Sequence, residues 1–227
     1  MSDTLHALFL RHVCQTSAAP LAIAVARAAG STVWDTAGRP YLDLLAGMGV
    51  ANVGHAHPEV VAAVRAQAER HLHVMVYGEF VQEAQVRLAA RLAGLLPPPL
   101  EVVYFTSSGA EAIEGALKTA RKHTRRPGLV AFAGGFHGDT LGALSLGGNP
   151  VYRTPFEPLL PSVTFLPFGD EAALGAIDTR TAAVVVEPVQ TEAGVRLPPP
   201  GFLPALRRRC DETGAKACIG VSDAPRE

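Results

Sequence analysis

The chain has 227 residues, of which 48% are hydrophobic, enough to build the buried core of a globular protein. Twenty lysines and arginines are balanced by 21 aspartates and glutamates, so no strong net charge attracts nucleic acid or an anionic membrane surface. No apolar run approaches the roughly 18 residues of a membrane span. We therefore expect neither nucleic acid nor a membrane as a partner.

The cysteines argue against a disulfide framework and against a zinc site. Cys14, Cys210 and Cys218 are odd in number and form no Cys-x-x-Cys pair. The first ten residues lack the basic start and the long apolar stretch of a signal peptide. We therefore expect a cytoplasmic protein without a metal.

The first hundred residues predict a small sheet followed by two helices. Apolar stretches at 32–34 and 41–45 flank the turn residues 35–38, which predicts a hairpin. Apolar residues then recur at helical spacing over 59–72 and over 82–96, which predicts two amphipathic helices. A run of three prolines ends the second helix, because proline lacks the N–H and clashes with the preceding turn.

From residue 102 onward, predicted strands alternate with predicted helices. Continuous apolar runs predict buried strands at 102–105, 129–132, 163–166 and 182–186. Helical spacing predicts helices over 110–123 and 202–212. Because the strands are apolar throughout and alternate with helices, we expect an α/β fold with a mostly parallel sheet and flanking helices.

The segment 106–112 follows a predicted strand and opens a predicted helix. Free N–H groups and the helix dipole favour a phosphate at such an end, where Gly109 lets the backbone come close and serine hydroxyls can donate. The same residues also match a capping box, in which Ser108 and Glu111 only satisfy the helix end. The sequence leaves both interpretations open.

A second motif, Gly134-Gly135-Phe136-His137-Gly138, also follows a predicted strand directly. Its glycines allow a sharp loop that brings an aromatic ring and an imidazole to the strand's carboxyl end, where ligands of open α/β sheets bind. The alternative is a glycine-rich turn with Phe136 in the core. The spacing is not that of a dinucleotide fingerprint.

Two carboxylates follow the strand predicted at 182–186. Glu187 comes directly at its carboxyl end and Glu192 five residues later, and both could neutralise or orient a cationic ligand. The alternative is two solvated loop carboxylates. By contrast, His55 and His57 are two residues apart, which is not the spacing of paired metal ligands on a helix, so we interpret them as part of a turn.

In their order and spacing, five segments resemble the class III aminotransferases, the family of the ornithine, acetylornithine and 4-aminobutyrate aminotransferases. They are Trp34 to Asp43, Asn52 to Pro58, Ser108 to Ala112, Phe136 to Gly138 and Glu187 to Gly194. The resemblance runs from about residue 20 to about residue 214. It implies an incomplete fold type I enzyme that depends on pyridoxal phosphate and forms a homodimer with shared active sites.

The resemblance also implies domain boundaries. Residues 1–54 correspond to an N-terminal arm and part of a small domain, and residues 55–214 to an incomplete large cofactor-binding domain. Residues 215–227 form a divergent tail, since the family pattern ends abruptly at about Ala215.

Carried over by position, the resemblance implies six cofactor-binding residues: Ser108, Gly109, Ala110, Phe136, His137 and Glu187. The first three correspond to the phosphate site. The phenylalanine corresponds to a ring that stacks on the pyridine with the histidine beside it, and the first glutamate to a group near the ring hydroxyl. Glu192 resembles the family's gate glutamate on the substrate side.

Amino transfer requires a lysine that holds the cofactor and moves a proton, and an aspartate paired with the ring nitrogen. In the family both come later in the chain, where a strand ends in Asp-Glu-Val-Gln and the lysine follows further on, whereas residues 216–220 here read Lys-Ala-Cys-Ile-Gly. Lys118 and Lys122 lie roughly 15 Å or more along their helix from its phosphate end and are expected to face solvent. We therefore assign no catalytic residue and expect negligible activity from this chain alone. Because the sheet is incomplete, we also expect exposed apolar surface and an unpaired edge strand.

Three functions stay open at this point. The parent enzyme is expected to move an amino group between an amino acid or ω-amine and a 2-oxo acid. The same scaffold can instead serve a racemase, an aminomutase or a decarboxylase. Finally, the chain can be a non-catalytic subunit that binds pyridoxal phosphate or pairs with a full-length relative.

Overall fold

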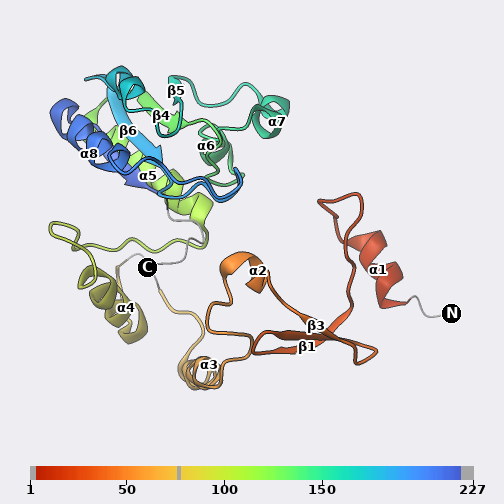
Figure 1. Cartoon of the computed structure of the whole chain (residues 1–227). Helices are drawn as coiled ribbons and strands as arrows, with labels where there is room; N and C mark the ends of the chain where they lie inside the picture. The colour runs from red at the N-terminus through yellow and green to blue at the C-terminus, as the bar shows by residue number, and fades with distance from the viewer. Residues whose placement is uncertain (1–3, 76–77, 221–227) are drawn as a thin grey trace. The chain divides into compact units, whose positions relative to one another are not determined.

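The structure, a computed structural model, describes residues 4–75 and 78–220 (Figure 1). The chain divides into two compact units, Met1–Glu83 and Ala84–Glu227. The functional domain boundaries expected after residues 54 and 214 stay a prediction. Of the tail expected at 215–227, residues 221–227 lie outside the described part.

The first unit is built on a three-stranded antiparallel sheet in the order β1-β2-β3. Its elements are α1 (Leu5–His12), β1 (Val25–Ala29), β2 (Thr32–Asp35), β3 (Pro40–Leu42), α2 (Ala46–Gly49) and α3 (Pro58–Arg70). The predicted hairpin is confirmed as β2 and β3, and the first predicted helix as α3. The strand β1 was not predicted, because its sequence Val-Ala-Arg-Ala-Ala has little apolar alternation.

A buried carboxylate holds the hairpin turn together. Asp35 accepts hydrogen bonds from the backbone N–H groups of Ala37 and Arg39, each at 2.9 Å. Its other oxygen accepts from Arg39 Nε at 2.7 Å and from the Tyr41 hydroxyl at 3.0 Å. Burial by itself raises the pKa of Asp35, but these hydrogen bonds outweigh it and lower the pKa to about 2.

A second carboxylate ends β3 earlier than expected. Asp43 Oδ1 accepts hydrogen bonds from the N–H groups of Leu45 and Ala46, each at 2.9 Å, which bends the chain out of the sheet. Asp43 Oδ2 lies 2.6 Å from His55 Nε2, and this hydrogen bond lowers the pKa of Asp43. The histidine pair expected in a turn therefore includes one residue that fastens that turn to the sheet.

The second unit contains a parallel sheet in the order β5-β4-β6-β7. Its strands are β4 (Gly128–Phe132), β5 (Val163–Leu166), β6 (Thr181–Val186) and β7 (Lys216–Ile219). Its helices are α4 (Glu83–Ala93), α5 (Gly109–Thr124), α6 (Leu141–Leu144), α7 (Pro150–Arg153), η1 (Thr154–Phe156), η2 (Ala172–Ala176) and α8 (Phe202–Thr213). The predicted parallel α/β sheet is confirmed.

Helices cover both faces of this sheet, with α8 on one face and α5 on the other (Figure 1). Successive side chains of a strand point to opposite faces. Accordingly, Val184 packs in the cluster that contains Phe202 and Leu206 of α8, whereas Val185 packs in the cluster that contains Leu117 of α5. Burial on both faces explains why β6 is apolar along its whole length.

One expected strand is absent, and one strand that was not predicted is present. Residues 102–105 form no strand, because no described strand pairs with them, and Val102 is 94% exposed. Conversely, residues 216–219, which lack a continuous apolar run, form β7 because the open edge of β6 supplies backbone partners from Ala183 to Val186. Pairing with a neighbour, which local sequence does not report, decides both cases.

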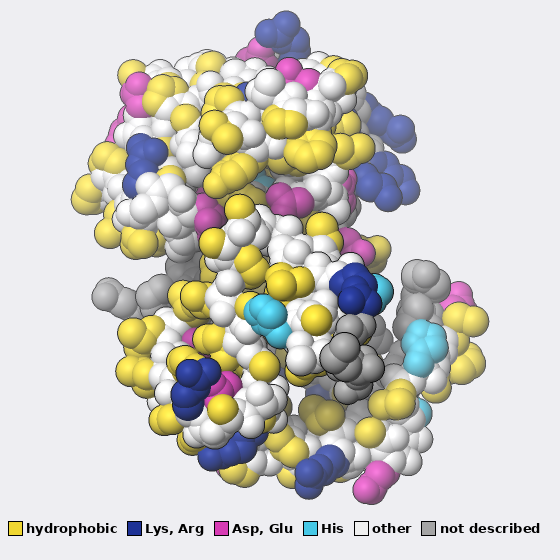
Figure 2. Space-filling view, turned by 90° about the vertical axis from the view of Figure 1, so that its right-hand side faces the viewer, with side chains coloured by type: hydrophobic (Ala, Val, Ile, Leu, Met, Phe, Trp, Pro, Cys, Tyr) yellow, Lys and Arg dark blue, Asp and Glu magenta, His cyan; other side chains and the backbone are white. Residues whose placement is uncertain are grey.

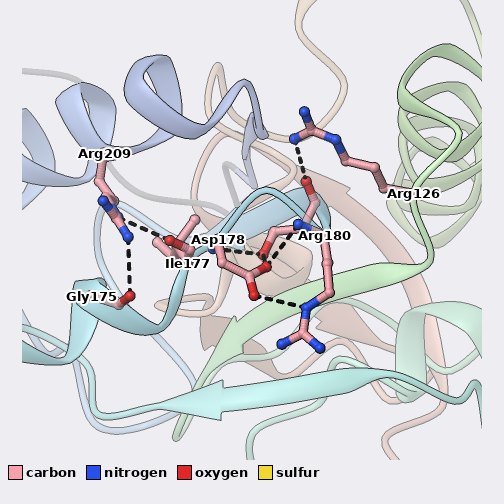
Figure 3. A network of polar contacts seen from close by, with 7 residues as sticks. Arg126, Gly175, Ile177, Asp178, Arg180 and Arg209 are labelled. Carbon is pink, nitrogen blue, oxygen red and sulfur yellow. Dashed lines mark hydrogen bonds and ion pairs between the residues drawn. The ribbon is translucent and has the colours of Figure 1, made fainter.

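Three arginines stabilise loops at the amino ends of the strands (Figure 3). Arg126 donates to the carbonyl oxygens of Thr213 at 2.8 Å and of Thr181 at 3.2 Å, which ties the end of α8 to the start of β6. Arg209 donates to the carbonyl oxygens of Ile177 and Gly175. A third, Arg180, pairs with Asp178 at 2.9 Å. These contacts satisfy loop carbonyls and carboxylates, so we see a structural role for them.

Large hydrophobic side chains are exposed in both units, and they are spread over the surface seen in Figure 2. Among the described strands of the parallel sheet, β5 and β7 are the edges. The expected exposed apolar surface and unpaired strand edge are thus present. No helix in the described part of the chain is long and apolar enough to cross a membrane.

The aromatic cluster under α8 generates a stability prediction. Phe202 is fully buried, with its ring 5.5 Å from that of Phe132 and 5.7 Å from that of Phe168. We expect Phe202→Ala to lower the free energy of unfolding by about 3–5 kcal/mol through cavity formation. Phe156→Ala, at a side chain that is 58% exposed, is the matched control and should cost far less. Urea denaturation monitored by circular dichroism measures both free energies of unfolding. Equal losses for the two variants would contradict the described core.

Candidate active site at the carboxyl edge of the parallel sheet

The carboxyl ends of β4 and β6 bring two of the predicted motifs together. The glycine-rich loop follows β4, and Glu187 follows β6. The backbone N–H of Phe136 donates to Glu187 Oε2 at 3.0 Å. Glu187 is only 2% exposed, so it is not the solvated carboxylate of the alternative interpretation. Two segments separated by fifty residues in the sequence therefore form one site.

The same loop also reaches the first turn of α5. Gly138 has a φ of 114°, and a Cβ on it would lie 2.6 Å from Ala110 Cβ. A side chain larger than hydrogen cannot fit there, so glycine is required both by the backbone angle and by the close approach. This contact joins the segment 106–112 at the start of α5 to the glycine-rich loop and to Glu187.

A variant of the capping box is present at the start of α5, in which Glu111 binds the residue before the N-cap Ser108. Ser108 Oγ accepts from the N–H of Glu111 at 3.1 Å, and Glu111 Oε2 accepts from the N–H of Ser107 at 2.7 Å. The first-turn N–H groups of a helix have no partners within it. Ser108 and Gly109 are exposed, and apart from its chain neighbours and the backbone of α5 no described atom lies within 4 Å of where a Cβ on Gly109 would stand. The helix end is thus capped and still open to an anion.

His137 is a buried imidazole with an unused nitrogen. It is 7% exposed, and its Nε2 has no hydrogen-bond partner among the described residues. Burial lowers the pKa of His137 to about 4, so the ring is neutral at pH 7. A Cβ on Gly220, which follows β7, would lie 3.6 Å from His137 Nδ1. The end of β7 therefore borders this site.

A cavity of about 200 Å³ opens beside the glycine-rich loop. Phe136 and Glu192 both line it, as do Asn149 and Tyr152. Phe136 is half-buried and faces the cavity, so it does not belong to the core as the alternative interpretation had it. Glu192 is exposed, consistent with a solvated carboxylate at the cavity's edge.

Sequence reasoning missed a second glycine loop. Gly147 and Gly148 line the cavity, and Gly148 N–H donates to the Gly135 carbonyl at 2.8 Å. A Cβ on Gly148 would lie 2.3 Å from the Phe132 carbonyl oxygen, so only glycine fits. The run Gly-Gly-Asn-Pro at 147–150 was the available signal. This run could not be recognised as part of the site from the sequence, because its contact with Gly135 depends on the fold.

The three lysines lie outside this cavity, although Lys118 borders a separate hollow together with Ser107 and Glu111. Lys118 and Lys122 are exposed on α5, as expected, and Lys216 is exposed on the edge strand β7. None of them lines the cavity.

Comparison with known proteins identifies the family. A family model described as aminotransferase class-III matches residues 13–217. The chain belongs to the class III aminotransferase family. This family depends on pyridoxal phosphate, and it acts on amino donors and acceptors.

Among its relatives, the acetylornithine aminotransferase of Methanopyrus kandleri is 50% identical over 186 residues, which cover 82% of this chain and 47% of the relative. That of Methanosarcina acetivorans is 44% identical over 195 residues, which cover 85% of this chain and 48% of the relative. The chain thus spans about half the length of the curated relatives it matches.

A solved structure supports the fold. The ornithine aminotransferase of Toxoplasma gondii, crystallised with partial occupancy of pyridoxal phosphate at its active site, matches with a TM-score of 0.80 and 31% identity. The match covers 94% of this chain and 51% of that one. The fold type I architecture expected from the resemblance is confirmed.

The buried histidine generates a prediction about pH. The unfolded chain takes up a proton on His137 below about pH 6.5, whereas the folded chain does so only below about 4. Stability contributed by the neutral ring is therefore complete above pH 6.5 and declines as the pH falls toward 4, by about 3 kcal/mol.

We expect His137→Gln to flatten this part of the pH dependence, whatever its effect on stability at pH 7. His123→Gln, at an exposed position on α5, should keep the wild-type slope. Urea denaturation at a series of pH values measures both. If NMR showed the His137 ring titrating near pH 6.5, its burial would be wrong.

Proposed function

We propose that this chain provides the pyridoxal-phosphate-binding face of a class III aminotransferase. The observation that carries the proposal is the convergence at one sheet edge of the α5 terminus, the loop after β4 and the carboxylate after β6. Fold type I relatives and the family match support it. Ligands of open parallel sheets bind at this edge.

The chemistry of the residues supports this proposal. The open N–H groups at Gly109 and Ala110, with the hydroxyl-bearing serines before them, suit a dianionic phosphate next to a helix terminus. The half-buried ring of Phe136 offers a flat apolar surface beside the cavity. His137, neutral and with an unpartnered buried nitrogen, suits a polar group of a ligand.

Each side chain has a defined task in this proposal. The α5 terminus holds the phosphate, Phe136 orients the ring, and Glu187 and His137 fix the polar groups of the cofactor. When bound, the cofactor withdraws electrons from the carbon next to the substrate nitrogen. Glu192, at the cavity's edge, meets the substrate.

We propose as substrates an amino acid or ω-amine donor and a 2-oxo acid acceptor. The relatives named acetylornithine aminotransferase, at 44–50% identity, favour a donor that carries a second nitrogen at the end of its side chain. A homodimer with shared active sites is part of the same proposal.

A second candidate function is favoured by the positions of the lysines. Amino transfer requires a lysine within reach of the cofactor. The three lysines of this chain are exposed and none lines the cavity. By itself, the chain is therefore proposed to bind the cofactor without a covalent bond and without turnover, as a non-catalytic subunit does.

The phosphate site is tested by adding a negative charge to it. Gly109→Asp has room for its side chain, and an acidic residue stabilises a helix N-terminus, so the fold should be retained. The carboxylate should repel the phosphate and weaken pyridoxal phosphate binding by roughly tenfold or more.

The matched control is Gly175→Asp, which adds the same charge at an equally open glycine in η2. Fluorescence titration with pyridoxal phosphate, and with pyridoxal as the ligand lacking phosphate, measures the effect. Equal affinities for Gly109→Asp and the control would exclude the α5 terminus as the phosphate site.

The absence of covalent attachment has a separate test. After incubation with pyridoxal phosphate and reduction with borohydride, mass spectrometry should find no stoichiometric modification of one lysine. Weak labelling spread over Lys118, Lys122 and Lys216 is expected, because all three are exposed. A single lysine modified to completion, together with amino transfer by the isolated chain, would show that one of them serves the reaction.

A further inference from the structure

Gln190 is a buried polar residue between the two glutamates of the site. It is 1% exposed, yet it does not line the cavity and the proposed function gives it no task. Its side-chain oxygen Oε1 has no hydrogen-bond partner among the described residues. A buried amide of this kind requires an explanation, because native proteins pair nearly all such groups.

The contacts of Gln190 connect two loops. Its side-chain Nε2 donates to the carbonyl oxygen of Ala133 at 3.0 Å, in the loop after β4. Its backbone exchanges two hydrogen bonds with Arg196, each at 3.0 Å, which close the loop that carries Glu192. One residue therefore ties the loop after β4 to the loop after β6.

Gly134 lies close to the Gln190 side chain. A Cβ on Gly134 would lie 3.0 Å from Gln190 Oε1 and 3.2 Å from Ala193 Cβ, and its φ is 82°. The two loops approach this closely only because the residue between them has no side chain. Gly134 and Ala193 both line the cavity, so the tie lies directly behind the cavity wall.

We infer that Gln190 is a positioning residue that sets the placement of Phe136 relative to Glu192. The first residue belongs to the loop after β4 and the second to the loop closed by Arg196, and both line the same cavity. The inference rests on the proposed function for the identity of the ligand, but not for the tie itself. The hydrogen bond of its amide to Ala133 distinguishes Gln190 from a residue that only fills space.

The test uses Gln190→Met, which keeps the length of the side chain and removes both polar atoms. Its matched control is Gln85→Met, at an exposed position of α4. Hydrogen exchange should become roughly fivefold to tenfold faster at residues 133–136 and 190–196, as expected for a lost hydrogen bond, and stay unchanged in α8. Pyridoxal phosphate binding should weaken by a similar factor, while inorganic phosphate binding at the α5 terminus stays unchanged.

Other outcomes overturn the inference. Unchanged exchange in both loops would show that Gln190 ties nothing. Faster exchange throughout the unit, or an equal loss of affinity for inorganic phosphate and for pyridoxal phosphate, would show a merely structural role. If the wild-type chain binds no pyridoxal phosphate, the proposed function fails, while the exchange measurement still decides the role of Gln190.

A second variant decides the matter if Gln190→Met does not fold. Gly134→Ala keeps the amide but places a methyl group 3.0 Å from its oxygen. Faster exchange at residues 190–196, on the far side of the tie, supports the inference. Wild-type exchange there overturns it.

Discussion

The parallel pairing of β4 with β6 is the constraint on which the candidate site depends. Because parallel strands end at the same edge, the loop after Phe132 and the loop after Val186 start side by side. The hydrogen bond from Phe136 N–H to Glu187 uses this proximity. An antiparallel pairing would send these two segments to opposite edges of the sheet, and Phe136 and Glu187 could not form one site.

The pairing in turn depends on burial of both faces. Side chains of β6 alternate between the α8 cluster and the α5 cluster, so each helix fixes the sheet from one side. The same packing places the first turn of α5 against Gly138. The start of α5, the loop after β4 and the buried Glu187 are therefore positioned by the two hydrophobic clusters that pack on the faces of this sheet.

Glycines determine how closely the loops approach. At Gly138 and Gly148 a side chain would overlap backbone or Cβ atoms at 2.6 Å or less. Gln190 adds a hydrogen bond between the two loops, from its side-chain amide to the carbonyl oxygen of Ala133. The site thus combines close backbone contact with a few buried polar groups, a design in which small displacements have large consequences.

The sequence by itself determined the class of fold and most of its longer helices and strands, because the periodicity of apolar residues is a local property. Five motifs in the family's order carried the resemblance to the family. The sequence also placed the candidate residues from Ser108 to Glu192, though their roles stay proposals. Only the tertiary structure decided that residues 102–105 form no strand and 216–219 do, because a strand requires a partner. It alone gave Gly148 and Gln190 their neighbours, since contacts between distant segments are set by packing and leave no local signal.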